Sequence, residues 1–153
     1  GAGQGRTYVY QVLATTAFAR TTVTSSASNT DEVSVGGRST QIELRKTVEN
    51  ETQGTGEGTS NLGSVNDILL YRIYLQNNAT TQASNVKIYD RTPPYTQLSE
   101  PIVDPQQVSP NLSCDLVVPA SNVASYAGTI EWNCTGQMLP GETGAVQFRV
   151  GIQ

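Results

Sequence analysis

Histidine is absent from this chain of 153 residues, and only 14% of its residues are charged. Without imidazole, the sequence has no histidine general base, no histidine metal ligand and no Ser-His-Asp triad. Its 13 Asp and Glu residues show no spacing typical of a catalytic acid-base pair. The sequence therefore predicts a protein that is not an enzyme and that uses no cofactor and no metal.

Basic clusters and long apolar runs are also absent. The formal net charge is -4 and the nine Lys and Arg residues are scattered, whereas a nucleic-acid partner requires a basic face. No segment approaches the roughly 18 consecutive apolar residues of a membrane span. The first residues, Gly1 to Gly5, lack the regions of a signal peptide. We expect no nucleic-acid partner and no membrane span, and we expect any signal peptide to have been removed already.

The residues that are present have the composition of an all-β protein. Hydrophobic residues make up 37% of the chain among many Gly, Ser, Thr and Asn, and no stretch rich in Ala, Glu, Lys and Leu predicts a helix. The length suits one core plus an arm. Strands are predicted over 42–48, 67–77, 84–90, 112–118, 129–134 and 145–152. Between them, 49–66 reads as an exposed loop and the proline-containing 97–110 as an extended loop at an edge.

One predicted strand, 67–77, is apolar on both of its faces. Leu69 and its alternate neighbours suit the core, but Ile68, Leu70 and Tyr74 then lie on the opposite face. We expect that second face to be covered by an arm or a neighbouring subunit, or else to carry ordinary surface hydrophobes.

The only two cysteines, Cys114 and Cys134, fall at the ends of two predicted strands. A disulfide between them fits a secreted protein, and two buried thiols in a cytosolic protein are the alternative. Trp132, the only tryptophan, is expected to anchor the core beside the bridge.

Four Asn-x-Ser/Thr triplets are potential glycosylation sites. The candidates for glycosylation are Asn50, Asn78 and Asn111, whereas Asn133 is disfavoured because its neighbour Cys134 should be tied into the core. A chain this rich in Thr, Ser and Asn also produces such triplets by chance, so an unmodified asparagine is the alternative at each site.

Five segments occur in an order that resembles a known repeat. They are 46–48, 67–77, 83–93, 130–132 and 139–150, which include a tyrosine strand ending in Asn, a Val-x-Ile-x-Asp-x-x-Pro strand, a tryptophan and Leu-Pro-Gly-Glu-Thr. This series resembles the conserved repeat of bacterial and archaeal surface proteins known as domain of unknown function eleven. The resemblance implies an immunoglobulin-like β-sandwich in secreted or cell-wall proteins, often in tandem and without catalysis.

The family pattern continues past the Phe-x-Val strand to a last strand that this sequence lacks after Ile152. The best match to that strand is 24–35, upstream of the domain. Two arrangements follow: the segment folds back on its own domain, or it pairs with the open edge of another copy. The short connection after the segment favours another copy over a crossing of its own sandwich.

The sequence thus divides into an extended N-terminal β-arm with a Gly36-Gly37 hinge (1–37) and an immunoglobulin-like β-sandwich without its own last strand (38–153). We expect a secreted subunit of an extracellular, pilus-like filament at the cell surface, assembled head to tail from copies of itself by donor-strand exchange, with glycans as candidate further partners. The alternative is a single repeat module of a large adhesin or surface-layer protein. The arm residues expected at the subunit interface are Tyr8, Tyr10, Val12, Leu13, Phe18, Val23, Asn29, Val33 and Val35.

A covalent link is also a candidate. Lys46 is predicted to point inward on the first strand of the sandwich, and the resemblance places Asn29 on the adjacent closing strand. Asp90 would supply a buried carboxyl that promotes an isopeptide bond between them. An ordinary ion pair between Lys46 and Asp90 is the alternative.

Overall fold

The computed structural model describes residues 7–18, 24–34 and 42–153, and this part of the chain is all-β, without a helix. The predicted all-β sandwich is confirmed. The strands are β1 (Thr7–Phe18), β2 (Thr24–Ser34), β3 (Ile42–Asn50), β4 (Ser60–Gly63), β5 (Ile68–Asn77), β6 (Ala83–Ser84), β7 (Lys87–Arg91), β8 (Thr96–Leu98), β9 (Gln106–Ser109), β10 (Leu112–Val118), β11 (Thr129–Met138) and β12 (Thr143–Ile152).

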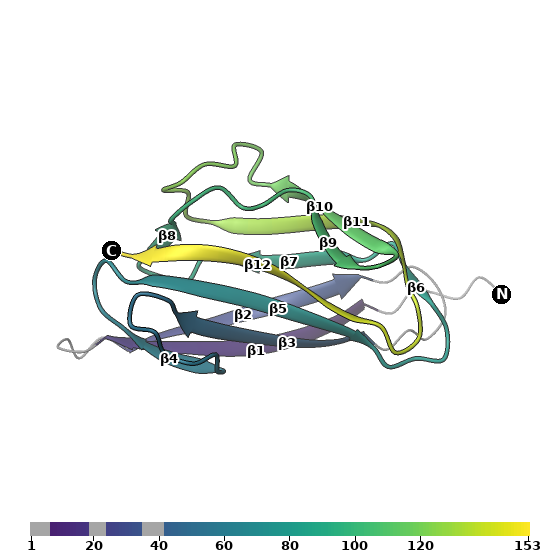
Figure 1. Cartoon of the computed structure of the whole chain (residues 1–153), viewed down its shortest axis with the longest axis horizontal. Helices are drawn as coiled ribbons and strands as arrows, with labels where there is room; N and C mark the ends of the chain where they lie inside the picture. The colour runs from purple at the N-terminus through teal and green to yellow at the C-terminus, as the bar shows by residue number, and fades with distance from the viewer. Residues whose placement is uncertain (1–6, 19–23, 35–41) are drawn as a thin grey trace.

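The strands form two sheets (Figure 1). The larger sheet has the order β4-β1-β2-β7-β11-β10-β9, with β6 paired to β11, and the smaller has the order β3-β5-β12-β8. All the pairings are antiparallel except that of β1 with β4, which is parallel. Several of the long strands pair with partners distant in the sequence, such as β5 with β12 and β7 with β11.

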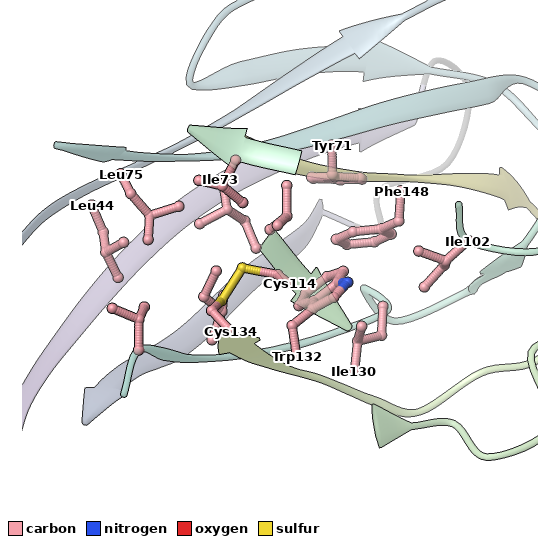
Figure 2. Close-up of a cluster of buried hydrophobic side chains, with 14 of the residues drawn as sticks. Leu44, Tyr71, Ile73, Leu75, Ile102, Cys114, Ile130, Trp132, Cys134 and Phe148 are labelled. Carbon is pink, nitrogen blue, oxygen red and sulfur yellow. A yellow bond between two sulfur atoms is a disulfide. The ribbon is translucent and has the colours of Figure 1, made fainter. Parts of the chain in front are cut away.

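The core lies between the two sheets. Trp132 of β11 is buried, and its ring centroid lies 6.3 Å from that of Phe148 on β12 in the other sheet. Phe148 in turn stacks on Tyr71 of β5 at 5.5 Å. Figure 2 shows these rings and the neighbouring aliphatic side chains gathered between the strands. Trp132 is therefore the core anchor that the sequence predicts.

Period-two alternation predicts the long strands well, and the short strands poorly. Along β3, Ile42, Leu44, Lys46 and Val48 are buried as expected. The two predicted loops, however, contain β4, β8 and β9. The strands β8 and β9 are compatible with the nearby prolines because each one lies at the end of its sheet, where half of the backbone groups need no strand partner.

The second apolar face of β5 is covered in part by the chain's own loop between β3 and β4. Glu57 of this loop accepts hydrogen bonds from Thr47 at 2.5 Å and from Arg72 at 3.1 Å, and both residues lie on the outer face of the sheet. The loop is also held to β3 by two backbone hydrogen bonds between Val48 and Gly58. Leu70 on this face is buried. The sequence predicts that an arm or another subunit covers this face. A loop of the same domain covers this part of it instead.

A helix with the length and apolar character needed to cross a lipid bilayer is not found in the part of the chain that the structure describes.

Candidate functional site

The outer edge of β7 is the place where the arm meets the sandwich. On its inner side, β7 pairs with β11 at five positions, from Lys87 opposite Asn133 to Arg91 opposite Thr129. On its outer side, it pairs with β2 at one position, Ser34 opposite Lys87. Among the described residues, the two sides of β7 therefore differ: β11 pairs with it at five positions and the arm at one.

The arm forms a hairpin, which the sequence does not predict. Strands β1 and β2 pair with each other at 11 positions, and β1 also pairs in parallel with β4 at four, from Thr15–Ser60 to Phe18–Gly63. The expectation of a single extended arm is therefore corrected: each strand of the arm finds its main backbone partner in the other. In the single chain the hairpin pairs with its own sandwich, through β4 and β7.

The arm residues predicted at an interface are distributed over this hairpin. Those in β1 are Tyr8, Tyr10, Val12, Leu13 and Phe18, and those in β2 are Asn29 and Val33. The register sets Val12 opposite Asn29 and Tyr8 opposite Val33. Val23, Val35, Gly36 and Gly37 lie outside the described residues.

Lys46 and Asp90 form a buried ion pair that joins the two sheets. Nζ of Lys46 on β3 donates a hydrogen bond of 2.7 Å to Oδ1 of Asp90 on β7. The side chains are 1% and 0% exposed. The alternation of both strands positions the pair, because Lys46 lies between the buried Leu44 and Val48, and Asp90 shares the inward face with Ile88. The sequence predicts that these two residues meet, and they do.

The surroundings of this pair are aromatic and dry. Nζ of Lys46 lies 5.1 Å from the ring centroid of Tyr71 and 5.7 Å from that of Phe148. Burial raises the pKa of Asp90 and outweighs the opposing effects of the Lys46 charge and of the hydrogen bonds from Lys46 and the Arg91 backbone. The pair is therefore removed from water, and each charged group depends on the other for compensation.

The predicted disulfide between Cys114 and Cys134 is present, with an S–S distance of 1.96 Å (Figure 2). The two residues are direct partners in the ladder of β10 and β11, so the bridge connects neighbouring strands of one sheet. Both are buried in the core cluster. The alternative of two free thiols is thereby excluded.

The three candidate glycosylation sites differ in exposure. Asn78 and Asn111 are exposed, and their side-chain nitrogens donate to Glu43 and Glu142. Asn50 is fully buried. Because a glycan needs a solvent-facing amide, the geometry of Asn50 does not fit the predicted modification.

The side-chain amide of Asn50 belongs to a buried polar cluster that the sequence does not predict. Its Nδ2 donates to the backbone oxygen of Leu62 and to Oδ2 of Asp67, both at 2.8 Å. Asp67 also accepts from the Ser64 backbone at 2.8 Å and from Gln53 at 3.1 Å. Desolvation raises the pKa of Asp67, but the hydrogen bonds from Asn50, Ser64 and Gln53 outweigh it and lower the pKa overall. The cluster holds the loop between β3 and β5 in place. In the sequence, its only signal is that Asn50 and Asp67 flank a glycine-rich loop.

Four glutamates near the surface form ion pairs with two arginines. Arg72 contacts Glu49 at 2.8 Å and Glu57 at 3.1 Å, and Arg149 contacts Glu51 at 2.8 Å and Glu100 at 3.0 Å. Such partly exposed pairs contribute little to stability. Within the described residues, no three Cys, Asp or Glu side chains come together in a way that could hold a metal ion.

No protein-family model, curated protein or solved structure matches this chain. The β7 edge and the buried Lys46–Asp90 pair are therefore interpreted from their own geometry.

Proposed function

We propose that this chain is a structural subunit of an extracellular filament, in which the arm of one copy pairs with the outer edge of β7 in the next copy. The observation that carries the proposal is the asymmetry of β7, which, in the part of the chain that the structure describes, pairs with β11 at five positions and with β2 at one. Addition of a strand to a sheet is a known mode of association between chains, and the arm strand β2 occupies such a position beside β7.

Exchange between copies would conserve the contacts that the arm makes in the single chain. The hairpin ladder of 11 positions is internal to the arm and moves with it. The described backbone pairs that must be released are that of Ser34 with Lys87 and the four of β1 with β4, and the neighbouring copy offers the same partners. Exchange then costs little in pairing, as in domain swapping, and a head-to-tail contact propagates into a fibre unless it closes a ring.

Two further observations support this function. The segment in β2 is the best sequence match to the last strand of the repeat that the chain resembles, and β2 lies between β1 and β7 in the larger sheet. The disulfide between Cys114 and Cys134 fits an oxidising compartment, as an extracellular location requires.

The sharpest test uses the pair of Ser34 and Lys87. One preparation carries Ser34→Cys alone, a second carries Lys87→Cys alone, and the two are mixed, allowed to assemble and oxidised. Only an arm inserted into another copy brings these two cysteines together, so we expect disulfide-linked dimers on a non-reducing gel. Mixing Ser34→Cys with Gln107→Cys is the matched control, because Gln107 is exposed on β9 at the opposite end of the same sheet.

A chain that carries both Ser34→Cys and Lys87→Cys completes the test. Linked oligomers from this double variant, together with fibres of the unmodified chain in negative-stain microscopy, are expected from exchange. A double variant that oxidises wholly within one chain, with no linked dimer from the mixed single variants, would eliminate the filament. That outcome, with monodisperse full-length particles, is the one expected of a single repeat module of an adhesin.

A further inference from the structure

A small hollow lies on the outer face of the smaller sheet, near the place where β12 ends beside β8 (Figure 1). Gly151 faces outward here, because its neighbours Val150 and Ile152 are both buried. The strand register pairs Gly151 with Ile68 of β5 on one side and with Gln97 of β8 on the other. Since Gly151 has no side chain, it leaves a gap between these two residues, and the hollow there has a volume of about 250 Å³.

The lining of this hollow is polar but uncharged. Among the described residues that line it, no side chain is charged, and the polar ones are three amides and two hydroxyls, from Asn66, Gln97, Gln153, Ser99 and Ser125. Amides and hydroxyls both donate and accept hydrogen bonds. The half-buried Ile68 adds an apolar surface. An anion would find no cationic side chain here and a cation no carboxylate, so the lining suits a neutral ligand that carries several hydroxyl groups.

The hollow is not an open sheet edge. On the side of β8 that faces away from β12, the backbone oxygen of Leu98 accepts a hydrogen bond of 2.7 Å from Ser125, and its N–H donates one of 2.8 Å to Tyr126. The strand β8 is therefore held between β12 and the segment 125–126. An added strand would have to displace that segment, so a ligand that bonds to side chains fits this surface better than strand addition.

Left-handed backbone conformations gather around the same hollow. Asn66, Tyr95 and Ser125 have φ angles of 72°, 60° and 69°, a region that costs free energy in residues other than glycine. Asn66 and Ser125 line the hollow, and the backbone oxygen of Tyr95 accepts a hydrogen bond from Gln153, which lines it too. Because residues held in this region cluster at ligand sites, their presence here supports a binding function.

We propose that this hollow binds a neutral carbohydrate, one sugar ring at a time. The hydroxyl groups of a sugar match the amides and hydroxyls of the lining, and its C–H face matches Ile68 and the neighbouring Tyr95, whose side chain is 63% exposed. The volume lies below the range of about 300–1,000 Å³ of pockets for larger ligands, which fits a single ring. The inference goes beyond the proposed function, because one sandwich contains the whole site.

The test is a glycan array probed with fluorescently labelled full-length protein from a host that does not glycosylate it. We expect binding to glycans that end in a neutral sugar and none to glycans that end in a carboxylated or sulfated one. Gln97→Ala should weaken binding about tenfold, the effect of one lost hydrogen bond. Gln147→Ala is the matched control, because Gln147 lies on the same outer face of β12 but outside the hollow, and it should bind like the unmodified protein.

A second variant, Gly151→Ala, fills the hollow without disturbing the fold. An added Cβ would lie 3.7 Å from Cδ1 of Ile68 and 3.9 Å from Nε2 of Gln153, which are ordinary van der Waals distances. We therefore expect Gly151→Ala to lose most of the glycan binding and to keep the thermal unfolding midpoint of the unmodified protein. Gly56→Ala, whose added Cβ has no atom within 4 Å, should keep both.

Two sources present such sugars, a free polysaccharide and a glycan carried by another copy of the chain. Competition on the array with starch and with glycopeptides from protein made in a glycosylating host distinguishes them, and displacement by either supports the site. Absence of any bound glycan, binding confined to charged sugars, or binding that survives both Gln97→Ala and Gly151→Ala would overturn it.

The outcomes also separate this site from the filament. Loss of fibres in Gly151→Ala, without glycan binding by the unmodified protein, would assign the hollow to a contact between copies and overturn the carbohydrate site. Glycan binding by particles that form no fibres would support the carbohydrate site and overturn the filament. Fibres that bind neutral glycans, beside Gly151→Ala fibres that do not, support both.

Discussion

Cys134 lies directly opposite Cys114 in the ladder of β10 and β11, and a disulfide joins them within one sheet. The bridge therefore does not hold the two layers of the sandwich together. That role falls to contacts across the core, among them the packing of Trp132 on Phe148 and the Lys46–Asp90 pair. The disulfide instead restrains the connection between β10 and β11, residues 119–128.

Removing the disulfide should destabilise the fold without changing its architecture. The two cysteines are separated by 20 positions, and closing a loop of that size stabilises a protein by roughly 3 kcal/mol in the chain-entropy model. We expect Cys114→Ala/Cys134→Ala to lose about this free energy of unfolding in urea denaturation. The double substitution of the adjacent ladder pair, Ser113→Ala/Thr135→Ala, is the control. A reductant should lower the stability of the unmodified protein and leave the alanine variant unaffected.

Gly144 is required by close packing between strands. A Cβ added at Gly144 would overlap the backbone oxygen of Val108, which cannot move aside as a flexible side chain could. We expect Gly144→Ala to cost about 1–3 kcal/mol, the usual range for overpacking, measured as a shift in the urea midpoint. Gly56→Ala is the control, since no atom lies within 4 Å of its added Cβ. Equal stability of the two variants would contradict the close approach.

Gly144 also illustrates what sequence patterns can and cannot predict. The clean alternation of β3 and β12 reveals their inward faces, because side chains on a strand alternate with period two. It also places Lys46 on an inward face, whereas its approach to Asp90 is what the family resemblance implies. Pro140 to Gly144 reads as a turn, yet β12 already begins at Thr143. The sequence alone cannot distinguish a glycine required by close contact with a distant backbone from a glycine required by a turn.

The arm and the loop after β3 show a second limit. The many β-forming residues of β1 and the resemblance of β2 to a closing strand favour extended strands. Their pairing with each other depends on a register that no local pattern encodes. Likewise, Asn50 reads as a surface sequon. Its burial depends on Asp67 and Leu62, which are brought to it only by the folded loop.

The ionisation of Asp67 should make the free energy of unfolding depend on pH. Its pKa is lowered in the fold, relative to about 3.9 in an unfolded chain, so the stabilisation is complete above that value. It should be lost as the pH falls from about 4 through the lower folded pKa. We expect Asp67→Asn to cost about 1–3 kcal/mol at neutral pH and to flatten this acid dependence in urea denaturation at several pH values. Asp115→Asn, an exposed substitution on β10, should match the unmodified protein, and an unchanged acid slope in Asp67→Asn would contradict the role of the cluster.

Glycosylation should follow exposure, although Asn50, Asn78 and Asn111 all begin sequons. In a host that glycosylates such triplets, we expect glycopeptide mass spectrometry to find glycans at Asn78 and Asn111, which are exposed, and none at Asn50, which is buried. Asn78→Gln and Asn111→Gln should lose a glycan and keep their stability.

Asn50→Gln is expected to behave in the opposite way. The longer side chain cannot keep the hydrogen bonds of Asn50 to both Asp67 and Leu62, and leaving buried polar groups unsatisfied costs about 1–3 kcal/mol. Thermal unfolding should therefore separate Asn50→Gln from the other two variants, with no change in glycan mass. A glycan on Asn50 in folded protein would show that this asparagine reaches solvent, and it would contradict the buried cluster of Asn50 with Asp67.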